Sequence, residues 1–139
     1  MINLNWEELC EAIGDYAKIR HYFLNKKTGE ILILSDYMSE AAKNEIKKRV
    51  KGSQFSDYVL IPTMESRDGY RLMEEFIEKS ADEKLKSQLT ESLSTEAPFK
   101  NFKEIVYNHP EERKHWIEFR EQKLLQRAKD WLKQIGVPV

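Results

Sequence analysis

The first forty residues change from a helical to a strand-like pattern of hydrophobic positions. Near the start, the apolar residues that recur at helical spacing are Trp6, Leu9, Cys10 and Ile13. Asn5 precedes them and can cap the free N–H groups of the first turn. Residues 19–24 and 30–34 are instead rich in strand formers, and the polar loop between them has Gly29 where a left-handed conformation is needed. We therefore expect a helix and then a β-hairpin.

The second strand of this hairpin is apolar at every position from 31 to 34. A half-exposed strand alternates between apolar and polar residues, so this run predicts that both faces are covered, the second by another helix or another subunit. A helix is expected over about 39–50 and a third strand over 58–62, which Pro62 ends. The inward positions of that helix are Ala42, Ile46 and Val50.

Beyond residue 65 the pattern is helical. Ser66 can cap a first helix, a second contains Leu85 to Leu93, Pro98 suits the first turn of a third, and the last should run from Pro110 to about Ile135. Because strands and helices are segregated, the fold class is predicted to be α+β. We expect a small antiparallel sheet, the hairpin plus a third strand in an order left open, packed by helices, within a single domain over residues 1–139.

Composition narrows the function classes. The formal net charge of −1 excludes a globally basic nucleic-acid-binding protein, although lysines gather between residues 43 and 51. Cys10 is the only cysteine, so no internal disulfide can form. No apolar run approaches the ~20 residues that span a bilayer, and the start lacks the basic and apolar regions of a signal peptide. A cytoplasmic protein that does not enter the membrane is expected.

Motifs for catalysis, metals and cofactors are weak. No glycine-rich phosphate loop or nucleophile elbow occurs. Glu112 and His115 lie one turn apart, but bundle di-metal sites need two such pairs, so a capping glutamate beside a surface histidine is expected. Glu74 and Glu78 should share a solvated helix face. We therefore expect no cofactor and no metal.

The last predicted helix carries one aromatic residue away from its apolar stripe. That stripe consists of Ile117, Leu124, Ala128, Trp131 and Ile135, with Leu132 at its edge. At 100° per residue, Phe119 falls roughly 150° from the centre of the stripe. Either the helix containing residues 99–106 covers it, or it belongs to an exposed aromatic and basic face. The residues of that candidate binding face are Phe99, Lys100, Phe102, Lys103, Trp116, Phe119 and Arg120.

Several segments together resemble an uncharacterised bacterial protein family, number 0158 of the UPF series. The resemblance rests on residues 22–25 and 28–30, on 61–62, on 73–77, on Ala97 and the phenylalanine and lysine run after it, on Trp116 with Phe119, and on a closing Trp131. In this chain Pro98 is inserted after the alanine, and Asn101 stands where the family has a second basic residue. The resemblance implies a small bacterial cytoplasmic protein without an established activity, and it supplies no catalytic residue.

Three functions are compatible with the sequence. The first is a non-enzymatic interaction or regulatory module that binds an acidic or aromatic-accepting protein partner through the candidate face, or that forms a homodimer. The alternative is a nucleic-acid-associated protein that uses the same face together with the lysines of the 39–50 helix. The third is an enzyme with a site assembled from distant residues such as His21, Glu65, Arg67 and Tyr70.

Overall fold

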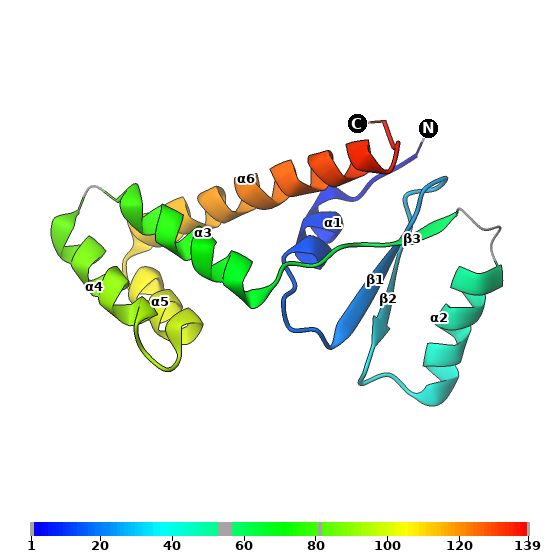
Figure 1. Cartoon of the computed structure of the whole chain (residues 1–139), viewed down its shortest axis with the longest axis horizontal. Helices are drawn as coiled ribbons and strands as arrows, with labels where there is room; N and C mark the ends of the chain where they lie inside the picture. The colour runs from blue at the N-terminus through cyan, green and yellow to red at the C-terminus, as the bar shows by residue number, and fades with distance from the viewer. Residues whose placement is uncertain (1, 53–56, 81, 139) are drawn as a thin grey trace. The chain divides into compact units, whose positions relative to one another are not determined.

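A computed structural model describes residues 2–52, 57–80 and 82–138 (Figure 1). Within them a three-stranded antiparallel sheet is accompanied by six helices, so the predicted α+β class is confirmed. In chain order the elements are α1 (Trp6–Ile13), β1 (Arg20–Asn25), β2 (Ile31–Ser35), α2 (Glu40–Gly52), β3 (Tyr58–Leu60), α3 (Ser66–Glu78), α4 (Glu83–Leu93), α5 (Pro98–Tyr107) and α6 (Pro110–Gln134).

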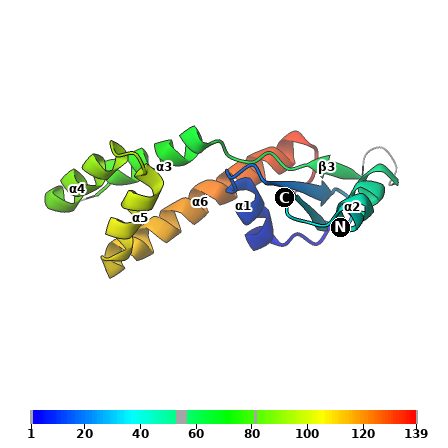
Figure 2. The same cartoon turned by 90° about the horizontal axis from the view of Figure 1, so that it is seen from below.

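The chain divides into two compact units. The first combines the residues up to Met64 with those from Leu124 onward, and it contains the sheet, α1, α2 and the C-terminal turns of α6. The second, Glu65–Lys123, is helical and contains α3, α4, α5 and the first turns of α6. Figure 2 shows the same elements turned by 90°. The expectation of a single domain stays a prediction.

The sheet has the strand order β2-β1-β3, which the sequence left open. Phe23 in the central strand lies opposite Leu32 on one side and Leu60 on the other, and both pairings are antiparallel. The Ile61 N–H still donates to the Tyr22 carbonyl (2.8 Å), one residue beyond β3. The pairing therefore stops just before Pro62, which has no N–H to donate.

Within the single chain, only one face of β2 is well covered, and cover of the other face by another subunit stays a prediction. Leu32 is buried, but Ile33 is 39% exposed on the opposite face. Ile33 pairs with Tyr22 of the central strand, which is buried. Because β2 is an edge strand, the side chains that cover the central strand do not extend fully over its neighbour. An all-apolar run can therefore occur in a strand that is only partly buried.

The ends of the helices follow local chemistry in most cases. The Asn5 side chain accepts a hydrogen bond from the Glu8 N–H (3.0 Å), as the capping pattern predicts. Pro98 stands in the first turn of α5, also as expected. The start of α3 differs from the prediction, because Glu65 and not Ser66 is its N-cap residue, and the Glu65 N–H donates to Asp68 Oδ2 (3.0 Å).

The apolar stripe predicted along α6 is also corrected. The buried residues of its C-terminal turns are Leu124, Ala128 and Leu132, whereas Ile117 is 36% exposed and both Trp131 and Ile135 are half-buried. The reason is that α6 contributes to two cores, so its buried face changes along its length. Although α6 has 25 residues, neither it nor any other helix in the described residues is apolar enough over a sufficient length to cross a bilayer.

The second unit has a core of aromatic rings. Phe76 of α3, Phe102 of α5 and Trp116 of α6 are all buried. Their rings pack edge to face, with centroids 6.2 Å apart for Phe76 and Phe102, 5.3 Å for Phe76 and Trp116, and 4.9 Å for Phe102 and Trp116. Such pairs stabilise a core beyond the area that they bury.

Gly29 should be essential to the hairpin. It has φ of +86°, and a Cβ added there would stand 2.4 Å from the backbone oxygen of Asn3, whose N–H donates to Thr28 O (3.3 Å). We expect Gly29→Ala to lower the free energy of unfolding by more than the roughly 1–2 kcal/mol of a left-handed alanine, because the Asn3 backbone must also move. Urea unfolding measures this change.

A matched control is Gly52→Ala, at the end of α2, where a Cβ would meet no atom of the described residues within 4 Å. It should leave stability unchanged or raise it by roughly 0.4–1 kcal/mol. Equal destabilisation by the two substitutions would contradict this account of the hairpin.

Candidate functional site

Phe119 lies beside the aromatic core and is half-buried. Its ring centroid is 5.7 Å from that of Phe76 in α3 and 6.2 Å from that of Trp116, one turn earlier in α6. The predicted cover was the helix with residues 99–106, but these recorded ring neighbours belong to α3 and to α6 itself. One side of the Phe119 ring is thus packed, and part of it is left accessible.

Two lysines lie over the Phe119 ring. Lys79 Nζ is 5.0 Å and Lys123 Nζ 5.5 Å from the ring centroid, distances at which a cation is attracted by the electron-rich face. Lys123 also pairs with Glu75 Oε2 (3.0 Å). Lys79 has no carboxylate partner among the described residues. A cation without a matching anion therefore stands at an aromatic surface.

A hollow of about 290 Å³ opens beside this ring. The residues that line it are Phe76, Lys79, Ser80, Glu112, His115 and Phe119. The Ser80 hydroxyl oxygen is buried and has no hydrogen-bond partner in the described part of the chain. An unpaired buried hydroxyl costs roughly 1–3 kcal/mol, and a ligand in the hollow would relieve that cost once the Ser80 side chain rotates toward it. The volume is at the low end for ligand pockets and suits a side chain better than a cofactor.

The structure corrects the role of two residues of the predicted binding face. Phe102 is fully buried and Trp116 is 4% exposed, so neither can contact a partner at the surface. Both rings fill the centre of the second unit. Phe99, Phe119 and Arg120 are half-buried, whereas Lys100 and Lys103 are exposed.

The predicted residues do not line one common hollow. Lys100 and Lys103 line a second one, of about 440 Å³, with Glu104, Tyr107 and Asn108. Tyr107 is 44% exposed, and the guanidinium carbon of Arg113 lies 4.6 Å from its ring centroid. The two hollows have no lining residue in common. Of the predicted residues, Phe119 lines the hollow beside the aromatic core, with two lysines over its ring, and we take this hollow as the candidate site.

Sequence reasoning missed the polar residues around Phe119. Lys79 and Ser80 follow the last turn of α3, where no motif marks them. Glu112 and His115 were expected to be a capping glutamate and a surface histidine; His115 is exposed, and its Nδ1 lies 3.9 Å from Glu112 Oε1. The angular offset of Phe119 and the one-turn spacing of Glu112 and His115 were the signals that pointed to this region.

The residues named for an enzymatic site have mostly structural contacts. His21 belongs to the first unit and the other three to the second. Tyr70 donates its hydroxyl hydrogen to the Leu93 carbonyl (3.2 Å), which joins α3 to α4, and the Glu65 N–H bonds to Asp68. Within the described residues, no group of three His, Cys, Asp or Glu side chains is placed to hold a metal ion.

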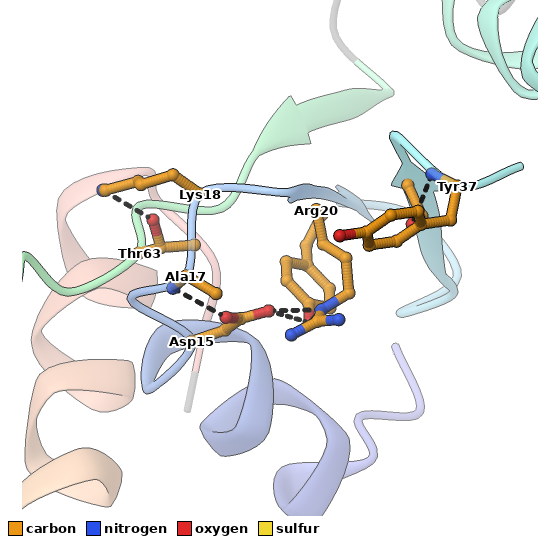
Figure 3. A network of polar contacts seen from close by, with 8 residues as sticks. Asp15, Ala17, Lys18, Arg20, Tyr37 and Thr63 are labelled. Atoms are coloured by element: carbon orange, nitrogen blue, oxygen red, sulfur yellow. Dashed lines mark hydrogen bonds and ion pairs between the residues drawn. The ribbon is translucent and has the colours of Figure 1, made fainter. Parts of the chain in front are cut away.

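A separate polar network lies in the first unit (Figure 3). Asp15, just after α1, accepts hydrogen bonds from Arg20 Nε (2.6 Å), the Tyr22 hydroxyl (2.6 Å) and the Ala17 N–H (3.1 Å). Burial by itself raises the pKa of the Asp15 carboxyl, but these hydrogen bonds together lower the pKa below its usual value. Burial and the bond to Asp15 raise the pKa of Tyr22.

This network holds the connection between α1 and β1. Lys18, in that connection, has φ of +65°, a strained conformation for a residue other than glycine. Its Nζ donates to Thr63 Oγ1 (3.2 Å), as Figure 3 shows. In the same view the Tyr37 N–H donates to Ser35 Oγ (3.2 Å). These bonds order a turn and a strand end, so we assign the network to stability.

Asp15→Asn should lower the free energy of unfolding at pH 7 by about 1–3 kcal/mol, the usual contribution of hydrogen bonds to a charged group. Because folding lowers the pKa of Asp15, its contribution is present above the unfolded-state pKa of about 3.9 and is lost as the pH falls through the folded value. The gap between wild type and variant should therefore close below about pH 4. Urea unfolding from pH 7 to pH 3 measures it.

Asp36→Asn provides the control, because Asp36 is an exposed aspartate of the same unit. It should change stability by less than about 0.5 kcal/mol at either pH. A gap for Asp15→Asn that stayed constant down to pH 3 would contradict a stabilising carboxylate.

Comparison with known proteins assigns the chain to a family. A family model described as an uncharacterised protein family (UPF0158) matches residues 2–137. A UPF0158 protein of Pseudomonas aeruginosa is 26% identical over 131 residues, which cover 94% of this chain and 82% of that protein. No solved structure matches the chain. With a match over nearly its whole length, as the resemblance predicted, the chain belongs to the UPF0158 family.

Proposed function

We propose that this chain is a non-enzymatic interaction module that binds an acidic segment of a protein partner at the Phe119 hollow. The proposal keeps Phe119 of α6 and the predicted aromatic and basic chemistry, but residues at the end of α3 replace the α5 part of the predicted face. The single observation that carries it is the half-buried Phe119 ring with two lysines above it and a hollow beside it.

An aromatic floor gives a partner side chain something to bury. Phe76 and Phe119 both line the hollow, with ring centroids 5.7 Å apart. Protein interfaces commonly gain most of their affinity from a few anchors of this kind. Because Phe76 is packed against the core, the floor is rigid before a partner arrives, which lowers the entropic cost of binding.

The cations select the charge of the partner. Lys123 already binds the carboxylate of Glu75, which supports the view that this surface accepts a carboxylate. Lys79 has no such partner in the described residues, and the unpaired Ser80 hydroxyl follows it directly in the chain. An aspartate or glutamate of the partner can pair with Lys79, and rotation of the Ser80 side chain brings its hydroxyl to the same carboxylate. Charge-assisted bonds of this type are stronger than neutral ones.

The same chemistry makes an enzyme the weaker proposal. The hollow holds a histidine and a glutamate, but His115 Nδ1 and Glu112 Oε1 are 3.9 Å apart, which is too far for a hydrogen bond, so no oriented acid–base pair supports an enzyme here. We place the interaction in the cytoplasm, because a sequence with one cysteine has none of the internal disulfides that are common in small secreted proteins.

Peptide selection tests the proposal without a known partner. Panning a phage-displayed library of random peptides on the full chain should enrich sequences with Asp or Glu beside an apolar residue. Fluorescence anisotropy measures the affinity of the enriched peptides for each variant. Phe119→Ala should lower this affinity roughly 30-fold or more, as expected for the loss of an anchor of about 2 kcal/mol. Lys79→Gln should also lower the affinity and reduce the salt dependence of binding.

Two further variants keep the test specific. Ser80→Ala should weaken peptide binding while leaving thermal stability unchanged or raised, because it removes an unpaired buried hydroxyl. The matched control is Tyr107→Ala, which removes another exposed ring with a cation above it from a different hollow. Peptides that bound the Phe119 and Tyr107 variants equally well, or that showed no enrichment in acidic residues, would contradict the proposal.

A further inference from the structure

Helix α2 packs against the rest of the first unit through little apolar surface. None of its residues is buried, and its inward positions Ala42, Ile46 and Val50 are only half-buried, at the places that the sequence predicted. An ion pair between Arg49 and Glu30 (2.6 Å), with Tyr58 also donating its hydroxyl hydrogen to Glu30 (2.6 Å), joins the helix to the sheet. Most of the α2 surface therefore faces solvent.

The basic residues of α2 fall into two groups. Arg49 and Lys43 form ion pairs within the chain: Arg49 pairs with Glu30, and Lys43 Nζ lies 3.6 Å from Glu40 Oε1. The second group is Lys47, Lys48 and Lys51, which are exposed and form no ion pair with any residue that the structure describes. In a chain of net charge −1, these three charges are concentrated on one short segment.

The three lysines share one side of the helix. At 100° per residue, they lie within an arc of roughly 100° that points away from Ile46 and Val50. Lys47 and Lys51 are one turn apart, which places their Cβ atoms about 5–6 Å from each other. The arc contains no large apolar side chain, so it lacks an anchor for a protein partner or for insertion into a lipid surface.

We infer that this lysine face of α2 binds single-stranded nucleic acid. Lysines suit phosphates because each is a mobile point charge that needs no planar partner. Tyr37, three residues before α2 begins, is 82% exposed and offers a ring on which a base can stack. Phosphates on the lysines and a base on the tyrosine give the contact pattern of a strand bound without sequence preference. This surface belongs to the first unit, and the Phe119 hollow belongs to the second.

Anisotropy with a fluorescein-labelled 20-nucleotide strand of mixed sequence, as RNA and as DNA, tests the inference on the full chain. Three phosphate contacts predict that affinity falls roughly 20-fold between 50 and 200 mM NaCl. The triple substitution Lys47→Gln, Lys48→Gln and Lys51→Gln should remove most of this salt dependence and a similar factor of low-salt affinity. Tyr37→Ala should weaken binding roughly 5- to 150-fold, and Tyr37→Phe should not.

Matched control variants test whether binding depends on the α2 lysines in particular or only on the total charge of the chain. Replacing three exposed lysines elsewhere, Lys84→Gln, Lys114→Gln and Lys129→Gln, changes the net charge equally and should leave most of the affinity. The inference is overturned if the wild-type chain does not bind either strand at 50 mM NaCl, or if both triple variants lose the same affinity. It is also overturned if poly-glutamate of equal charge competes as well as the unlabelled strand, since α2 would then select an acidic protein.

Discussion

The edge-to-face packing of Phe76, Phe102 and Trp116 is the interaction on which the helical unit depends. It joins α3, α5 and α6 at one point, and each ring fills space that the others leave. Phe119 stands next to this cluster and completes it from the side. An aromatic surface that solvent reaches is thus held in place by a buried core, so the candidate site is rigid because the fold requires it.

Local rules of sequence predicted much of the architecture. The Asn5 cap, the left-handed Gly29 and Pro98 at the start of α5 depend on interactions within a few residues, and each is found where the sequence places it. The predictions that failed concern positions whose burial depends on residues distant in the sequence. Whether Ile33 is covered depends on how far its neighbours extend over an edge strand, and no residue near it in sequence records that.

The candidate site was likewise only partly predictable from the sequence. Phe119 could be found, because the sequence places it roughly 150° away from the apolar stripe predicted for its helix. The burial of Phe102 and Trp116 could not be predicted, since each, like Phe119, has a basic residue within two positions in the sequence, and only the packing between helices decides which ring is buried. Lys79 and Ser80 come from a different helix end, and their relation to Phe119 exists only in three dimensions.

Net charge hides the two basic surfaces, because acidic residues elsewhere balance them. The surfaces differ in what surrounds the cations. Around Phe119 the lysines lie over a ring and beside an unpaired hydroxyl, so a ligand there must supply an anion together with an apolar group. On α2 the three lysines lie on a solvated arc without a large apolar side chain, and the ligand inferred there supplies repeated phosphates. The difference in neighbouring side chains, and not the number of charges, is therefore the reason why we propose different partners for the two surfaces.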